Sequence, residues 1–253
     1  MRALRVGRSR GFTLTELAVV FAIIALLLAA GMYTLSAQFD QRNFEETRRR
    51  LDAARDLLLG FAVVTGRLPC PATATSAGAE AITTPPNCDA TYGGFLPARA
   101  IGFQVVDTAG FAVDAWGNRL RYAVSSTTPT CTPAASALPH FTNAANLRTN
   151  GITCQPNDLV VCRSATGITA TTCGSASPVT NQTTLVAIVF ATGRNGAVGS
   201  GGIDEAANVN GDRVFVWHTP TPVGAANGEF DDHMTWITVG ELYGKLISAG
   251  LLP

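Results

Sequence analysis

Residues 10–35 constrain this chain most, because a basic leader there runs into a long apolar segment that carries one carboxylate, Glu16. The leader has four arginines and no acidic residue, and the nineteen residues from Leu17 to Leu35 carry no charge. A helix needs about 20 mostly apolar residues to cross a bilayer, so a helix over 12–36 is long enough to span one. Arginines before a span stay on the cytoplasmic side, which places the rest of the chain on the far side.

The carboxylate of Glu16 needs an explanation, because a charge within hydrocarbon costs roughly 2.5–3.5 kcal/mol on insertion scales. A secretory signal peptide, cut near Ser36-Ala37, explains the leader but normally has a shorter apolar region. A plain N-terminal anchor explains the length but neither Gly11-Phe12 nor Glu16. A third interpretation accounts for all of these residues.

The segment G-F-T-L-T-E-L at residues 11–17, followed by an apolar run, resembles the N-terminal signal of type IV pilins and type II secretion pseudopilins. The resemblance implies that a prepilin peptidase cuts after Gly11 and methylates the new N-terminus, Phe12. It also implies that Glu16 serves assembly. In a filament, Glu16 of one subunit would neutralise the amine of Phe12 on its neighbour, and a pair within one chain, at i and i+4, is the alternative. Shorter likenesses to pseudopilins and large pilin-like proteins lie at 114–118 (DAWGN) and 66–71 (GRLPCP).

The charge balance argues against a general nucleic-acid surface. The whole chain has 18 basic and 18 acidic residues, and loss of the four leader arginines would leave 14 against 18, a net charge of −4. Nucleic-acid binding proteins usually carry a basic excess.

Six cysteines all follow the apolar segment, on the side predicted to face an oxidising compartment: Cys70, Cys88, Cys131, Cys154, Cys162 and Cys173. An even number there predicts disulfides, and six cysteines allow 15 pairings. Proximity in sequence favours Cys70–Cys88, with the other four closing the segment 131–173. A mixture of bridges and free buried thiols is the alternative. The sequence has no C-x-x-C, so a zinc site is not favoured.

The helix is expected to continue through 37–65, where apolar and small residues recur at heptad-like steps: Phe44, Thr47, Leu51, Ala54, Leu58 and Phe61. Gly66 and Pro69 then end it. Short strands are predicted at 119–124, 158–163, 184–191, 213–217 and 234–239, with long loops between them. A short C-terminal helix with Leu242, Leu246 and Ile247 inward follows a capping box of Thr238 and Glu241. The fold class is therefore α+β: a long helix on an antiparallel sheet with disulfide-stapled loops.

Acidic and amide side chains crowd two C-terminal loops: Asp204, Glu205, Asn208, Asn210, Asp212, Glu229, Asp231 and Asp232. Oxygen ligands at alternating positions suit calcium, and some pseudopilins resembling this chain hold calcium in such a loop. The residues chosen as ligands are Asp204, Asn208, Asn210 and Asp212, although the EF-hand pattern is not matched. Ordinary turn chemistry is the alternative. No other cofactor and no catalytic constellation is predicted, so an enzyme is not expected.

The sequence thus predicts a leader at 1–11, a transmembrane or filament-core helix at 12–36, an amphipathic half at 37–65 and a globular domain at 66–253. The resemblance implies a minor pilin or pseudopilin, of a type IV pilus or a type II secretion system. Its partners would be prepilin peptidase, other pilin subunits and, before assembly, inner-membrane lipid. It would cross the bacterial inner membrane once, with its C-terminal domain periplasmic, and then join a periplasmic or cell-surface filament. The alternative is a membrane-anchored periplasmic binding or enzymatic domain that forms no filament.

Overall fold

The computed structural model describes residues 13–85, 87–128, 138–196 and 201–252, and of these the side chains of 30–37 are left out. The chain divides into two compact units, Met1–Asn43 and Phe44–Pro253.

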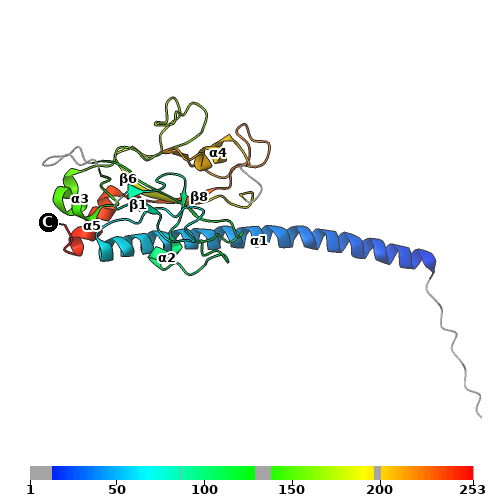
Figure 1. Cartoon of the computed structure of the whole chain (residues 1–253). Coiled ribbons are helices and arrows are strands. Elements are labelled where there is room, and N and C mark those ends of the chain that lie inside the picture. Colours follow the sequence, from blue (N-terminus) through cyan, green and yellow to red (C-terminus); the bar gives the residue numbers. More distant parts are fainter. Residues whose placement is uncertain (1–12, 86, 129–137, 197–200, 253) are drawn as a thin grey trace, which may run out of the picture. The chain divides into compact units, whose positions relative to one another are not determined.

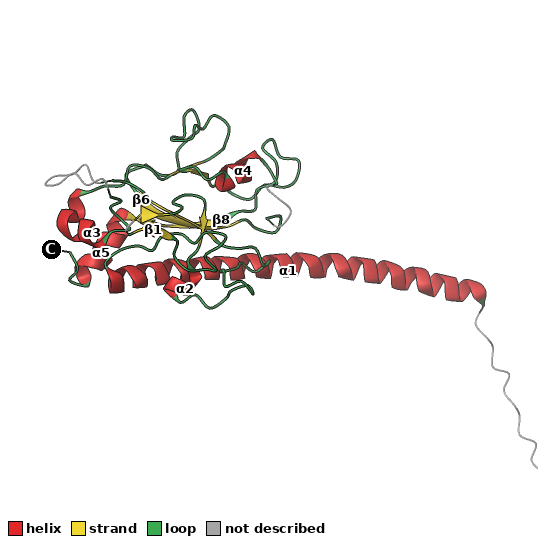
Figure 2. Cartoon of the chain, in the orientation of Figure 1, coloured by secondary structure: helices red, strands yellow, loops and turns green. Residues whose placement is uncertain are grey.

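Short helices and strands follow the long first helix along the described residues, with long loops between many of them (Figure 2). In chain order they are α1 (Leu14–Thr65), β1 (Ile82–Thr84), β2 (Asn87–Cys88), β3 (Gly94–Phe95), α2 (Ala98–Ile101), β4 (Arg121–Val124), α3 (Ala144–Asn150), the 3-10 helix η1 (Gly151–Thr153), β5 (Val160–Cys162), β6 (Leu185–Ala191), α4 (Ile203–Val209), β7 (Val214–Val216), β8 (His233–Thr238) and α5 (Val239–Ser248).

Helix α1 is 52 residues long and ends where the sequence predicts. Gly66 adopts the left-handed region with φ of +77°, and its N–H bonds the carbonyl of Ala62 at 2.8 Å. A glycine just past the last turn closes a helix in this way without a Cβ clash. The expected seam is buried at its centre, since Leu51, Ala54 and Leu58 are at most 2 % exposed.

The central sheet has the strand order β3-β4-β6-β8, and every neighbouring pair is antiparallel. Strand β6 reads LVAIVFA and is buried along its whole length, as expected for a run of β-branched and aromatic residues in a central strand. Its neighbours are fixed in register by Tyr122↔Val189 and Ile188↔Trp236. The α+β class with an antiparallel sheet is therefore confirmed.

Within the second unit, the two faces of this sheet are covered by different elements (Figure 1). On one face, Leu58 of α1 belongs to the same buried core as Tyr122 and Val189. On the other face, Ile188 packs in a second core with Phe215 of β7. One pairing differs from the expected antiparallel pattern, because β5 and β7 run parallel in a two-stranded sheet of their own. Parallel neighbours need a long connection, and here 51 residues separate the two strands, from Arg163 to Arg213.

The C-terminal helix α5 follows the predicted cap only in part. Thr238 accepts a hydrogen bond from the N–H of Glu241 at 3.3 Å, as a capping box requires. The carboxylate of Glu241 instead pairs with Arg55 of α1, at 2.6 Å. Leu242 and Leu246 are fully buried as expected, whereas Ile247 is 45 % exposed, so its inward placement was wrong. The helix turns Tyr243 inward in its place.

The segment 114–118 forms a tight turn. The carboxylate of Asp114 accepts hydrogen bonds from the N–H groups of Trp116 and Asn118, at 2.9 and 2.8 Å. Gly117 has a φ of +88°, which favours glycine at this position. The ring of Trp116 meets that of Phe44 edge to face at 4.9 Å. A tight turn beside a packed aromatic accounts for this short sequence.

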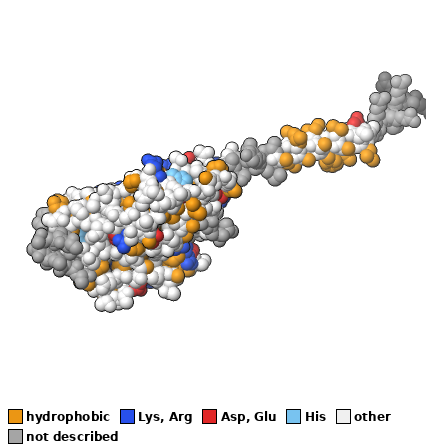
Figure 3. Space-filling model, turned by 90° about the horizontal axis from the view of Figure 1, so that it is seen from above, with side chains coloured by type: hydrophobic (Ala, Val, Ile, Leu, Met, Phe, Trp, Pro, Cys, Tyr) orange, Lys and Arg blue, Asp and Glu red, His pale blue; other side chains and the backbone are white. Residues whose placement is uncertain are grey.

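The first unit is apolar on its surface. Figure 3 shows hydrophobic side chains over most of the visible face of the described N-terminal turns of α1. In this part of α1, Leu14 is 86 % exposed and Leu26 is 71 % exposed. Among the described residues, no helix contains an apolar stretch long enough to cross a bilayer. The membrane span expected over 12–36 stays a prediction.

Candidate functional site

Glu16 lies in the first turn of α1, where it forms a reciprocal cap with Thr13. The hydroxyl of Thr13 accepts a hydrogen bond from the N–H of Glu16 at 3.2 Å. In return, Oε2 of Glu16 accepts one from the N–H of Thr13 at 2.9 Å and one from its hydroxyl at 2.8 Å. This is a capping box, in which two otherwise unpaired N–H groups are satisfied at once. The positive end of the helix dipole also stabilises a carboxylate at this position.

The cap leaves part of the Glu16 carboxylate available. Among the described residues, its second oxygen, Oε1, makes no hydrogen bond, and the side chain is exposed. Gly11 and Phe12, the predicted cleavage and methylation residues, lie outside the described residues. The sequence spacing that predicted an assembly role for Glu16 therefore also encodes a local helix cap, a role that the T-x-x-E pattern at 13–16 could have shown.

Two of the predicted disulfides are present. Cys70 and Cys88 are bridged, as proximity in the sequence favoured, and Cys162 is bridged to Cys173. Cys154 is also disulfide-bonded, while Cys131 lies outside the described residues. No described cysteine is free.

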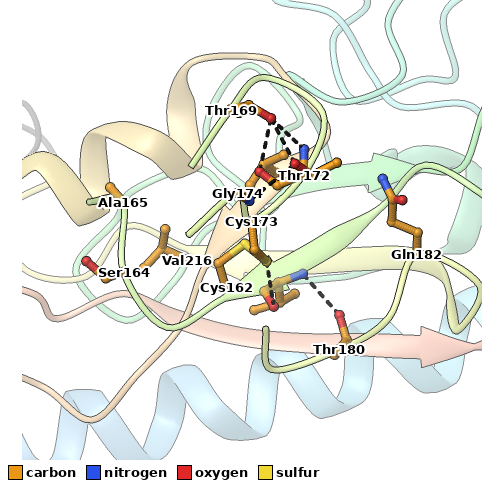
Figure 4. The surroundings of a disulfide bond; sticks show 12 residues. Cys162, Ser164, Ala165, Thr169, Thr172, Cys173, Gly174, Thr180, Gln182 and Val216 are labelled. Atoms are coloured by element: carbon orange, nitrogen blue, oxygen red, sulfur yellow. Dashed lines mark hydrogen bonds between the residues drawn. A yellow bond between two sulfur atoms is a disulfide. The ribbon is translucent and has the colours of Figure 1, made fainter. Parts of the chain in front are cut away.

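The bridge between Cys162 and Cys173 joins the end of β5 to the loop that follows it (Figure 4). Thr169 folds this loop back on itself, because its hydroxyl accepts a hydrogen bond from the N–H of Thr172 at 3.0 Å. On the other side of the bridge, the N–H of Val161 donates to the hydroxyl of Thr180 at 3.0 Å. The bridge closes a short loop and restricts the unfolded chain, so that less conformational entropy is lost on folding.

The four residues chosen from the sequence as calcium ligands belong to three separate hydrogen-bond networks. Oδ2 of Asp204 lies 3.1 Å from Nε2 of His218. Asn208 bonds the backbone N–H of Val216 at 2.7 Å. Asn210 and Asp212 form an exposed turn of their own, as the alternative of ordinary turn chemistry expected. Among the described residues, Asn208 alone of the four bonds an acidic side chain outside the set, since its Nδ2 donates to Asp232 at 2.7 Å.

A different set of acids meets in the interior. Glu205 lies in the first turn of α4, and Asp231 and Asp232 lie just before β8. One carboxylate oxygen from each comes within 4.8 Å of the other two, and the three side chains are 2 %, 5 % and 3 % exposed. We call Glu205, Asp231 and Asp232 the acidic cluster.

The loop after β6 closes over this cluster. The N–H of Arg194 donates to Oδ2 of Asp231 at 2.9 Å, and Nδ2 of Asn195 donates to Oε2 of Glu205 at 2.9 Å. Gly193 permits the approach, because a Cβ there would overlap Oδ1 of Asp231. The backbone of Asp231 completes the arrangement by donating to Oε1 of Glu205 at 2.7 Å.

The ionised forms of the carboxyls in the acidic cluster are disfavoured inside the protein. Burial raises the pKa of Asp231 to about 7, and the nearby carboxylate of Glu205 raises it as well. Burial likewise raises the pKa of Asp232 well above its usual range. These carboxyls therefore take up protons at a higher pH than exposed ones unless a cation offsets their charge.

The acidic cluster borders a cavity of about 400 Å³, whose lining includes Glu205 and Asp232 together with Arg119 and Arg121. All three acids stand out in the sequence, but nothing local groups them, because Glu205 and Asp231 are 26 residues apart. The consecutive acids Asp231-Asp232, placed directly before a predicted strand, were the available signal.

Comparison with known proteins finds one family motif, near the N-terminus. The model of the prokaryotic N-terminal methylation motif matches residues 7–32, a range that includes Gly11, Phe12 and the Thr13–Glu16 cap. No curated protein and no solved structure matches the chain. Residues 7–32 are therefore the prepilin-type signal of type IV pilins and pseudopilins.

Proposed function

We propose that this chain is a structural subunit, a minor pilin or pseudopilin, of a type IV pilus or a type II secretion filament. The observation that carries the proposal is the methylation motif at 7–32 with Glu16 in the first turn of the helix. The motif supports a prepilin peptidase as processing enzyme and pilin-like proteins as assembly partners. The proposed role is mechanical rather than catalytic.

The exposed apolar surface of the first unit is consistent with such a role. Side chains such as Leu14, Phe21 and Leu26 are 86 %, 61 % and 71 % exposed. Exposed apolar surface of this kind marks a region that contacts a membrane or another protein. In the proposal, inner-membrane lipid covers it before assembly and the helices of neighbouring subunits cover it afterwards.

The carboxylate of Glu16 supplies the register in this proposal. Its Oε2 is used by the cap of its own chain, and its Oε1 is left to receive the amine that cleavage creates on Phe12 of a neighbour. Pairing the two charges lowers the cost of holding either one within an apolar filament core. The large globular part favours a low-copy subunit over the bulk of the filament.

The experiment separates the charge of Glu16 from its cap. Glu16→Gln keeps a side-chain acceptor for the N–H of Thr13 but removes the charge, whereas Thr13→Val removes the hydroxyl and keeps the charge. Each variant is expressed in the native host, and both processing and the amount recovered in filaments are measured. We expect both to be cut, with Glu16→Gln at least tenfold depleted in filaments and Thr13→Val close to the wild type.

Mass spectrometry of the wild-type protein from its native host tests the proposal itself. The expected mature chain lacks residues 1–11 and carries a methyl group on Phe12. A chain that retains Met1 would contradict the proposal and favour the anchored periplasmic domain. Wild-type assembly of Glu16→Gln would instead show that register does not depend on this charge.

A further inference from the structure

The cavity beside the acidic cluster lies at one end of the central sheet. The strand register places Arg121, at the start of β4, between Phe95 of β3 and Phe190 of β6. Asp232 comes two residues before Met234, the partner of Phe190 in β8, and alternate residues of a strand share a face. Phe95, Arg121 and Asp232 therefore belong to one face of the sheet, and all three line the cavity of about 400 Å³.

The lining includes a guanidinium that the protein leaves without an anion. Arg121 packs its guanidinium over the ring of Phe95, 4.5 Å from the ring centroid, and bonds only the carbonyl of Gly93, at 3.5 Å. Burial lowers the pKa of Arg121, as expected for a charge partly removed from water. In the described part of the chain no carboxylate forms an ion pair with Arg121, whereas Arg119 is paired with Asp107 at 2.7 Å. Such a guanidinium suits a carboxylate, which it can bind through two parallel hydrogen bonds.

The same lining includes acceptors that lack donors. Asp232 accepts a hydrogen bond through Oδ2 alone, from Asn208 at 2.7 Å, and its Oδ1 is buried without a partner among the described residues. Oδ1 of Asn195, another lining residue, is unpaired in the same way. Buried acceptors without a partner are costly, and in native structures each of them calls for an explanation. A positively charged group with several N–H donors would satisfy both acceptors.

The cation and the acids of the cavity do not satisfy each other. Strand β6 lies between β4 and β8, so the backbones of Arg121 and Asp232 are at least about 10 Å apart, two strand spacings. Across the described residues, Arg121 makes no ion pair with Asp232 or with Glu205. The acids repel a simple anion and Arg121 repels a simple cation. A ligand with a carboxylate at one end and an ammonium group at the other is attracted by both.

We propose that this cavity binds the zwitterion of an amino acid or short peptide, with its carboxylate on Arg121 and its ammonium group towards Asp232 and Oδ1 of Asn195. An ammonium group supplies three N–H donors, and Glu205 adds a further negative charge at that end. The volume of the cavity is at the lower end of the roughly 300–1,000 Å³ of small-molecule sites, which suits so small a ligand. The remaining lining residues besides Phe95 and Arg119 are uncharged: Gly117, Asn118, Thr192, Gly196 and Val209.

The test uses the purified full-length chain and two probes, glycine and diglycine, whose binding is followed by ligand-observed NMR. Two analogues each remove one charge, since N-acetyl-diglycine lacks the ammonium group and diglycinamide lacks the carboxylate. We expect saturable binding of at least one of the two zwitterions, and at least tenfold weaker binding of both analogues. The site does not depend on leader cleavage or on assembly, so this result and the test of the proposed function are independent.

Variants then locate the carboxylate of the probe. Arg121→Gln should weaken binding of the zwitterion at least tenfold, while binding of diglycinamide stays as weak as in the wild type. The matched control is Arg148→Gln, which changes an exposed arginine of α3 outside the cavity lining and should stay within twofold of the wild type. If Arg121→Gln fails to fold by circular dichroism, Arg121→Lys replaces it. This variant keeps the charge without the planar fork and should weaken binding severalfold.

Three results would overturn the proposal. The first is the absence of saturable binding of both glycine and diglycine to the folded wild-type chain, which would mean that the cavity holds only water. The second is binding of either capped analogue as tight as that of diglycine. The third is an affinity that the change at Arg121 leaves within twofold of the wild type.

Discussion

The two ends of helix α1 are built from similar apolar residues but find cover in different ways. Between Phe44 and Thr65, the apolar seam is buried by the chain's own sheet, and Leu58 is fully buried. Between residues 14 and 29, the leucine and isoleucine side chains are 45–86 % exposed. One end therefore contributes to the stability of the globular part, and the other offers its apolar surface to lipid or to neighbouring subunits, as proposed above.

The largest effect is expected at the covered end. Leu58→Ala removes a fully buried side chain from the main core and should lower the free energy of unfolding by about 2–5 kcal/mol. All three tryptophans lie in the second unit, so their fluorescence during chemical denaturation reports on that unit alone. A loss below about 1 kcal/mol would show that the seam of α1 is not part of the folded core.

A smaller effect is expected from acid, through the core beside α5. Burial lowers the pKa of His140 from 6.5 to about 4, and its Nε2 lies 3.0 Å from the hydroxyl of Tyr243. His140 therefore binds a proton at a higher pH in the unfolded chain than in the folded chain. Its contribution to the free energy of unfolding is complete above pH 6.5 and is lost as the pH falls towards 4. The depression corresponds to at most about 3 kcal/mol. The measurement is the free energy of unfolding from pH 7 to pH 4.

The comparison for this prediction is His140→Gln, which cannot take up the proton and should show a shallower dependence on pH. Other groups persist in both proteins. Burial lowers the pKa of His233 to about 4, which has the same sign, whereas the raised pKa of Asp231, about 7, makes stability fall as the pH rises from 3.8 towards 7. Equal slopes in the wild type and the variant would contradict the assignment to His140.

The smallest effect on stability is expected at the uncovered end. Leu26→Ala changes a side chain that is 71 % exposed, so the free energy of unfolding of the globular part should change by less than about 0.5 kcal/mol. Recovery in filaments from the native host should nevertheless fall, because this apolar surface is proposed to pack there. A loss of stability as large as that of Leu58→Ala would erase the distinction between the two ends.

Local chemistry explains what could be predicted from the sequence. The helix end at Gly66, the cap at Thr238 and the buried strand β6 each depend on residues within a few positions of one another. Patterns of this kind are visible without a fold.

Contacts between distant segments could not be predicted in the same way. The parallel pairing of β5 with β7 joins strands that are separated by 51 residues. The acidic cluster likewise depends on β8 returning beside β6, which brings Asp231 to Glu205 and to the loop at Asn195. Regular spacing within one loop pointed to Asp212, although its carboxylate serves only its own turn.

The Thr13–Glu16 cap has a consequence for maturation. A cut after Gly11 would leave both partners, and the peptide amide that links Phe12 to Thr13, on the retained product. Precursor and product would then share the same first turn, and the enzyme would alter electrostatics rather than conformation, by turning a neutral amide into an ammonium group beside an acid that is already held in place.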